Sequence, residues 1–230
     1  MATRRLWRRG GNSMKRTIGW VVVAAGLGVA MLDGCVVPLV GAAAVGGTVV
    51  ATDRRPVGIQ VEDKAIESRV NAALIDKIPK TAMNINVTSY NRKVLLAGQV
   101  RTAEMRALAE QAAAKVENVR QVVNELTVGE TASLGDRTDD TLLAGKVKTA
   151  LLGAEGVPTG VVTTTVEQGV VYLMGKVSPS EGEAAAKTAS RVSGVRRVVK
   201  LFDLISDQEV AAIKKSQEAS PSGAKNEGRP

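Results

Sequence analysis

The 230-residue chain has no histidine, one cysteine and few aromatic residues. Without histidine it lacks the side chain that most often transfers protons near neutral pH and a common zinc ligand. Its single cysteine, Cys35, cannot form an intramolecular disulfide. Two tryptophans, two tyrosines and one phenylalanine leave few rings on which single-stranded nucleic acid could stack. These shortages argue against a zinc enzyme, a disulfide-stabilised fold and a single-strand-binding protein.

The sequence also lacks a recognisable set of catalytic residues. It has no nucleophile with a base at a plausible spacing, no cluster of metal ligands and no dinucleotide-binding glycine pattern. The acidic pair Asp139 and Asp140 suits the first turn of a helix, where carboxylates complement the helix dipole, better than a general acid and base. We therefore expect a protein that is not an enzyme and that has no catalytic residues, no metal and no cofactor.

A basic segment and an apolar run precede the cysteine. Residues 1–34 carry six of the 31 basic residues and one of the 23 acidic residues, which leaves 25 basic and 22 acidic residues, or a net charge of +3, in the rest of the chain. Most of the formal charge of +8 therefore belongs to a segment typical of a secretory signal, and we expect no nucleic-acid partner. The sequence leaves open whether translation starts at Met1 or at Met14.

The stretch LDGC resembles a lipobox, the processing site of bacterial lipoproteins. Leu32 lies three positions before Cys35 and Gly34 lies directly before it, whereas Asp33 is acidic where a small or neutral residue is usual. The resemblance implies that Cys35 is acylated, with palmitate among the attached chains, and becomes the mature N-terminus. How far Asp33 impairs this processing stays open.

The residue after the cysteine bears on localisation. Val36 stands where an aspartate would signal retention in the inner membrane, so the resemblance implies sorting to the outer membrane, with the chain lipid-anchored and facing the periplasm. Two alternatives remain: a buried structural cysteine, and a retained membrane helix that extends the apolar residues 17–32 past Cys35.

Beyond the cysteine, the chain contains two copies of one unit. Most of the second copy aligns with the first at an offset of 77 residues, and its last strand aligns at an offset of 76. The aligned segments are 63–74 with 140–151, 94–100 with 171–177, and 116–123 with 192–199. The repeats occupy residues 62–129 and 138–206.

Each copy predicts the order helix, strand, strand, helix, strand. Apolar residues recur at helical spacing in the first element, and alternating strands follow on either side of a polar turn. Ser178 and Glu181 form a capping-box pattern, and Gly194, like Asn118 in the first copy, suits a left-handed turn. The expected helices span 63–74, 103–117, 140–151 and 179–193, with hairpins and a final strand in each repeat.

This order, with Gly98 and Gly175 near the end of the second strand and the VSGVRRVV element, resembles the BON domain of bacterial envelope proteins. The resemblance implies an α+β fold of two tandem BON domains, each a three-stranded mixed sheet packed on two helices (αββαβ). In-strand glycines indicate a bulge or a close approach rather than a phosphate loop. The full division expected is a signal peptide at 1–34, the lipidated cysteine and tether at 35–61, BON domains at 62–129 and 138–206, and a disordered tail at 207–230.

The first helix of the second repeat offers the candidate binding surface. With Leu143 at the centre of the buried stripe, the 100° step of the α-helix turns Leu142 and Leu152 away from the core, near Lys146 and Lys148. Leucine beside lysine suits the boundary between acyl chains and anionic headgroups. We predict that Leu142, Lys146, Lys148 and Leu152 bind phospholipid, while Leu142 packing on the first repeat and a protein partner remain alternatives.

A duplicated BON unit behind a lipobox resembles dual-BON outer-membrane lipoproteins. That family implies a non-catalytic periplasmic lipoprotein that binds anionic phospholipid, such as phosphatidylglycerol or cardiolipin, and supports envelope integrity and cell division. The alternative is a protein-interaction scaffold that serves an outer-membrane assembly machine.

Overall fold

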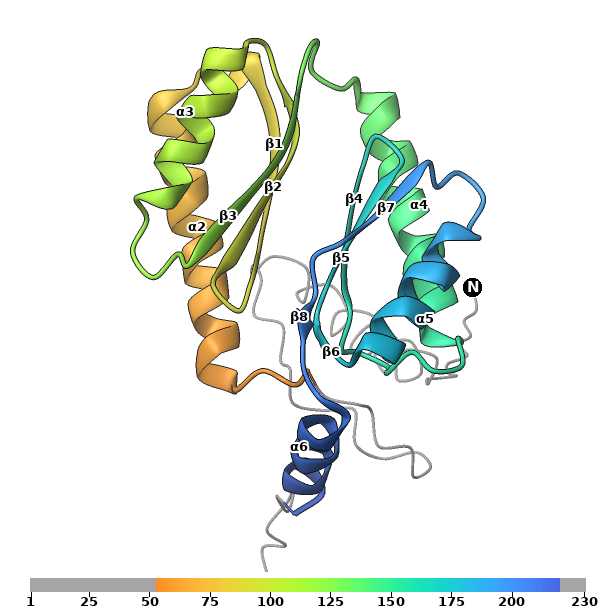
Figure 1. The fold of residues 1–230 in the computed structure, drawn as a ribbon. Helices are drawn as coiled ribbons and strands as arrows, with labels where there is room; N and C mark the ends of the chain where they lie inside the picture. Colours follow the sequence, from red (N-terminus) through yellow and green to blue (C-terminus); the bar gives the residue numbers. More distant parts are fainter. Residues whose placement is uncertain (1–52, 220–230) are drawn as a thin grey trace, which may run out of the picture. The chain divides into compact units, whose positions relative to one another are not determined.

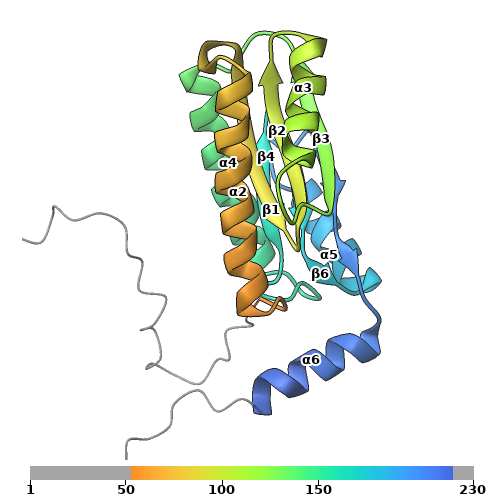
Figure 2. The same cartoon turned by 90° about the vertical axis from the view of Figure 1, so that its left-hand side faces the viewer.

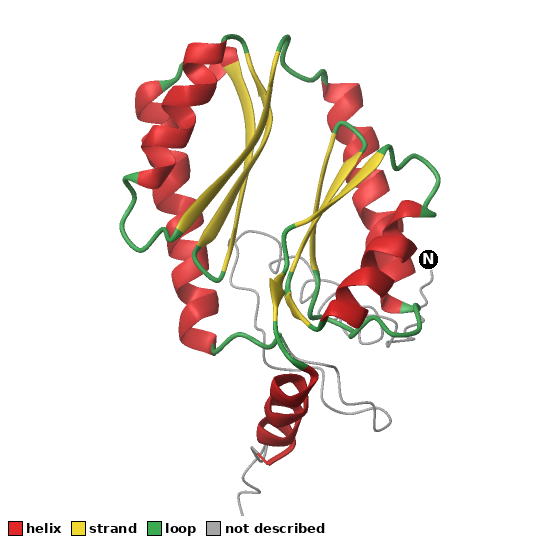
Figure 3. Ribbon diagram, viewed as in Figure 1, coloured by secondary structure: helices red, strands yellow, loops and turns green. Residues whose placement is uncertain are grey.

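The structure is a computed structural model, and it describes residues 53–219 of the chain. Cys35, the signal peptide and residues 220–230 lie outside the described residues. Within the described part, no helix is both long and apolar enough to span a membrane. The described residues hold two copies of the predicted unit and one further helix (Figures 1 and 3).

The first repeat has the predicted order of elements. The hairpin strands pair antiparallel, and the third strand pairs parallel to the second after a helical crossover, as parallel strands require. The sheet order is β1-β2-β3. The elements are α2 (Val57–Lys77), the short 3-10 helix η1 (Lys80–Ala82), β1 (Met83–Tyr90), β2 (Lys93–Val100), α3 (Ala103–Ala114) and β3 (Gln121–Val128).

The second repeat follows the same plan with two interruptions. Its main sheet has the order β4-β5-β7, and the ends of the second and third strands form a separate two-stranded sheet, β6 with β8. The first break falls at Gly175, between β5 and β6. The elements are α4 (Leu134–Leu152), β4 (Thr163–Glu167), β5 (Val170–Met174), β6 (Lys176–Val177), α5 (Pro179–Ser190), β7 (Arg197–Lys200) and β8 (Asp203–Leu204). Both mixed sheets with their two helices confirm the predicted α+β class.

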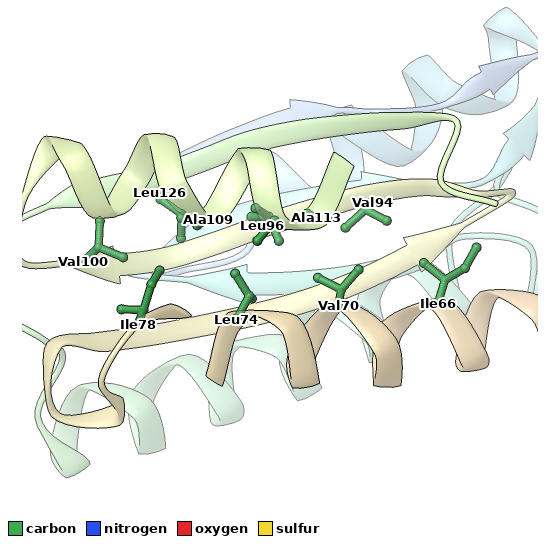
Figure 4. Close-up of a cluster of buried hydrophobic side chains, with 11 residues drawn as sticks. Ile66, Val70, Leu74, Ile78, Val94, Leu96, Val100, Ala109, Ala113 and Leu126 are labelled. Carbon is green, nitrogen blue, oxygen red and sulfur yellow. The ribbon is translucent and has the colours of Figure 1, made fainter. Parts of the chain in front are cut away.

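Each repeat buries one helix stripe against one face of its sheet. In the first repeat, Ile66, Val70 and Leu74 of α2 meet Val94 and Leu96 of β2 (Figure 4). The three α2 residues are 0–1% exposed, and burial of such side chains contributes about 1.5–3 kcal/mol each. The spacing of three or four residues puts them on one side of the helix, which is why the sequence pattern was sufficient to find them.

The central strands are buried on both faces. In β2, Val94 and Leu96 face the helices, while the alternate residues Leu95 and Ala97 form a separate cluster with Tyr172. The same cluster includes Tyr90 and Met174. Side chains of a strand point alternately to opposite faces, so one face serves the repeat's own core and the other serves the contact with the second repeat.

One boundary differs from the sequence-based expectation at the N-terminal side. The expected tether reached residue 61, but α2 begins at Val57. Arg54 is 6% exposed and donates two hydrogen bonds of 2.6 and 2.7 Å to the Glu181 carboxylate, and Arg55 stacks on the Tyr90 ring. The chain is therefore fixed to both repeats before the first helix starts, through partners more than 30 residues away that no local pattern indicates.

The expected disordered tail is also partly wrong. Residues 207–219 form helix α6 (Asp207–Ala219). Asp207 and Glu209 occupy its first turn, where they complement the helix dipole, and Val210 is 7% exposed. A 2.7 Å ion pair joins Glu209 to Lys176 of the second repeat. Low apolar content suggested disorder, but one buried valine and one ion pair attach this helix to the fold.

Candidate functional surface

Helix α4 begins earlier than the repeat alignment suggested. Ser133 caps it, and Ser133 and Asp136 form a capping box in which each side chain bonds the other's backbone N–H. Asp139 and Asp140 therefore lie in the second turn, and the expectation that they occupy the first turn is wrong. The extra turn also exposes Leu134, which is 81% exposed and which the sequence analysis did not single out.

Asp140 stabilises the hairpin turn of its own repeat. Its carboxylate oxygens accept hydrogen bonds of 2.7 and 2.9 Å from the backbone N–H groups of Gln168 and Gly169, both of which have positive φ. The equivalent residue of the first repeat, Asp63, accepts the corresponding bonds from Asn91 and Arg92, each 2.7 Å. Alignment of the repeats places both aspartates at the same position, and this shared position is the indication in the sequence that they have the same role.

The four predicted lipid-contact residues are all exposed. Leu142 is 60% exposed and Leu152 is 51% exposed, and Lys146 and Lys148 are exposed as well. Leu142 therefore does not pack against the first repeat. Within residues 53–219 neither lysine takes part in an ion pair, so both charges are available to a ligand.

These four residues form two separate pairs on the exposed side of α4. Leu142 lies about 40° from Lys146 around the helix axis, and Lys148 lies about 40° from Leu152, by the 100° helical step. The two pairs are about 120° apart on the same basis. They do not form a single patch, and a flat surface that touches both pairs must also touch the strip of helix between them.

The strip between the pairs has little free polarity. It contains Gly145 and three threonines, and each threonine hydroxyl donates to the carbonyl four residues earlier, at 2.8–3.0 Å. A hydroxyl bonded in this way leaves the methyl group outermost. We define the outer surface of α4 as Leu134, Thr138, Thr141, Leu142, Gly145, Lys146, Lys148, Thr149 and Leu152.

A hollow of about 440 Å³ opens beside Leu142 and Lys146. Arg196, from the turn before β7, lines it together with these two residues, and Asp139 lies on its acidic side. The sequence analysis missed Arg196, because a residue 50 positions after Lys146 reaches the helix only through the fold. The hollow brings two basic groups together beside an exposed leucine, and it is also lined by Asp136, Asp139 and Asp140.

Comparison with known proteins identifies the family. The BON domain family model matches residues 62–130 and 139–205, more than half of the chain. The chain belongs to the BON domain family. It is 39% identical over 172 residues to the outer membrane lipoprotein DolP of Haemophilus influenzae. The aligned residues cover 74% of this chain and 89% of the relative.

Two other relatives each match about two thirds of the chain. The 21 kDa hemolysin of Actinobacillus pleuropneumoniae is 37% identical over 66% of this chain and 79% of its own. The osmotically-inducible protein Y of Escherichia coli is 31% identical over 66% of this chain and 77% of its own.

The two BON domains of this chain differ at the hollow. In the first domain, Arg69 and Asn118 both donate to Glu62, at 2.6 and 2.9 Å. These bonds, first from Asn118 and then from Arg69, lower the pKa of Glu62. The equivalent residues of the second BON domain are Lys146, Gly194 and Asp139. Gly194 has no side chain that could replace the Asn118 bond, and within residues 53–219 no ion pair joins Lys146 to Asp139.

Proposed function

We propose that this protein is a non-catalytic envelope lipoprotein whose second BON domain binds anionic phospholipid through the outer surface of α4. The observation that carries the proposal is the pairing of exposed leucines with lysines that have no acidic partner in the described residues. Apolar side chains enter the boundary between headgroups and acyl chains, and each basic group near an anionic surface contributes about 1 kcal/mol. The first BON domain lacks this combination because Glu62 pairs with its cation.

The hollow beside α4 is the proposed headgroup subsite. Lys146 and Arg196 approach the phosphate, while Leu142 inserts next to the acyl chains. Asp139 lines the same hollow and opposes an anion there. Asp136 and Asp140, which also line it, are already bonded to a helix cap and a hairpin turn.

The anchor in this proposal is acylated Cys35, which holds the chain to the periplasmic side of the outer membrane. The similarity to an outer membrane lipoprotein and the lipobox-like LDGC support this location. Anchoring raises the effective concentration of lipid around α4, so a weak headgroup affinity is sufficient. In the cell, the protein would support outer-membrane integrity, including at the division site.

Vesicle binding tests the lipid proposal. A chain without residues 1–35 is mixed with vesicles of phosphatidylglycerol or of phosphatidylcholine, and co-sedimentation is measured. We expect binding to phosphatidylglycerol alone. Lys146→Glu with Lys148→Glu removes two favourable charges worth about 2 kcal/mol, so binding weakens by about thirty-fold or more. Asp139→Asn removes the opposing charge and should strengthen binding.

The matched control is Lys64→Glu with Lys77→Glu on α2, which makes the same change in net charge on the first BON domain. It should leave vesicle binding unchanged. Equal binding of the parent chain to both vesicle types would overturn the lipid proposal. The scaffold alternative holds instead if two results are found together. The parent chain binds neither vesicle type, and the Lys146→Glu, Lys148→Glu variant captures an outer-membrane protein as well as the parent chain does.

A further inference from the structure

The outer side of α2 carries an apolar seam at a heptad spacing. We define the seam as Gly58, Val61, Ala65, Ser68, Ala72 and Ile75, which follow one another at intervals of three or four residues. These positions lie opposite the core residues of the same helix. Val61 is 65% exposed and Ile75 is 50% exposed. Figure 2 shows α2 in front of the sheet of the first BON domain, with one side of the helix turned away from it.

The composition of the seam is unusual for a solvent-facing helix side, which is normally charged or polar. Only Ser68 among the six residues has a polar side chain. A methyl group added at Gly58 would meet no atom within 4 Å, so the fold of one chain does not require glycine there.

The seam is complementary to itself in the antiparallel direction. In an antiparallel helix pair, the first position of a heptad on one helix packs against the fourth position on the other. This pairs Ile75 with Gly58, Val61 with Ala72, and Ala65 with Ser68 of the second copy. In each layer a larger side chain packs on a smaller one. The two-fold axis repeats every contact, so the same match occurs at both ends of the seam.

The flanking charges favour the same direction. Antiparallel packing brings Glu62 of one copy beside Arg69 of the other, and the two-fold axis repeats this attractive pair. Parallel packing would instead place Lys64 beside Arg69, a repulsion between like charges. By the 100° helical step both residues lie beside the seam, and within one chain Arg69 already donates a 2.6 Å bond to Glu62.

We propose that α2 pairs antiparallel with α2 of a second copy of this chain, and that the first BON domain is the dimerisation domain. The seam is short, about 26 Å at 1.5 Å per residue, so the dimer is weak in solution and relies on confinement to the membrane. Two copies joined in this way present two α4 surfaces to one bilayer. The dimer does not depend on lipid binding by α4.

Cysteine crosslinking in membranes tests the dimer with the full-length chain. Two copies with different tags, one Val61→Cys and one Ala72→Cys, are co-expressed and treated with a short thiol crosslinker. We expect the mixed product to exceed the Val61→Cys homodimer by about tenfold, because antiparallel packing brings residues 61 and 72 together and separates residue 61 from its own copy by about 16 Å along the helix. The unmodified chain, whose single cysteine is Cys35, gives the background.

Ile75→Glu and Val128→Glu form a matched pair for the same assay, since both residues belong to the first BON domain and each is 50% exposed. Ile75→Glu should lower the mixed product about tenfold, a loss of about 1.4 kcal/mol, and Val128→Glu should not. Absence of the mixed product, dominance of the Val61→Cys homodimer, or sensitivity to Val128→Glu alone would each overturn the proposal. Circular dichroism establishes that both variants are folded.

Discussion

The side-chain hydroxyls of Thr88 and Thr165 lie 2.9 Å apart, and these residues are equivalent in the two repeats, 77 positions apart. Around them, Leu95 lies in one cluster with its equivalent Tyr172. Contact between equivalent residues is what an approximate two-fold axis produces, as in a symmetric dimer. The two BON domains are thus joined through the sheet faces that their own helices do not cover.

The threonine contact predicts coupled effects of mutation. Thr88→Val and Thr165→Val each leave one hydroxyl in this interface without its partner, at a cost of about 1–2 kcal/mol. The double variant has no unpaired hydroxyl, so its loss should be smaller than the sum of the single losses. Urea unfolding of all four proteins measures the coupling. Strictly additive losses would contradict a bond between the hydroxyls.

Glu167 predicts a stability that rises as pH falls. Its Oε1 accepts from Asn84 and Gln99 of the first BON domain, at 3.1 and 2.8 Å. Burial raises the pKa of Glu167, and the bond from Gln99 only partly opposes this. The folded protein therefore holds the proton more tightly than the unfolded chain, and between the usual value of 4.5 and the raised pKa, acidification stabilises the fold.

Glu167→Gln tests this directly, because the amide oxygen of glutamine can accept both bonds without a charge. We expect its melting temperature to exceed that of the parent at about pH 8 and the difference to disappear toward about pH 4.5. A melting-temperature difference that is the same at every pH would show that ionisation of Glu167 has no part in the interface.

Gly98 and Gly145 predict opposite responses to alanine. Gly98 has φ +129°, and a Cβ there would lie 2.0 Å from the Asn84 carbonyl oxygen of the neighbouring strand. Gly98→Ala should therefore destabilise by about 3 kcal/mol or more, through both clash and backbone strain. A Cβ at Gly145 meets nothing within 4 Å, so Gly145→Ala in mid-helix should stabilise by about 0.5–1 kcal/mol. Thermal unfolding of both variants distinguishes the two cases.

Asp63 and Asp140 predict losses of different size from the same substitution. Besides two turn N–H groups, Asp63 accepts 2.7 Å bonds from Ser89 and Arg55, and it is 1% exposed. Asp63→Asn loses acceptor capacity for several of these donors and should cost about 3 kcal/mol. Asp140→Asn affects only the two turn groups at a more exposed site and should cost about 1 kcal/mol. Equal losses in urea unfolding would argue against the larger role of Asp63.

Arg54 predicts that the segment before α2 stabilises the fold. Arg54→Ala leaves the Glu181 carboxylate without its bidentate partner and should cost about 2–4 kcal/mol, while Arg54→Lys should recover part of it. Burial alone raises the pKa of Glu181, but the bonds from Arg54 and from the Ser178 backbone outweigh burial and lower it overall. This contribution is present above the usual value of 4.5 and is lost as pH falls through the lowered pKa. The loss of unfolding free energy caused by Arg54→Ala should therefore become smaller at acidic pH.

Local patterns in the sequence were sufficient for the elements and their order. The capping box at Ser178 and Glu181 is present, and Asn118 and Gly194 have φ of 66° and 101°. However, α3 and α5 end at Ala114 and Ser190, three residues before the predicted ends, because the chain passes through a further turn before the positive-φ residue.

Contacts between distant residues could not be read in this way. Asp140 was assigned to a helix end, but its partners are backbone groups of a turn 28 residues later. Arg196 reaches the hollow beside α4 only because β7 runs parallel to β5. The aligned aspartates of the two repeats did indicate a shared role, although not which donors they bind.

The sequence by itself determined the duplication, through self-similarity at an offset of 77 residues. It also determined the αββαβ order and the helix face that carries Leu142 and Lys146, because these follow from periodicity within a dozen residues. Only the tertiary structure decided that the segment around Arg54 joins both BON domains, that residues 207–219 form a helix, and that Asn118 completes a network around Glu62 in the first domain. Those outcomes depend on side chains more than 50 positions apart or on one buried contact, and helical or strand periodicity contains no information about either.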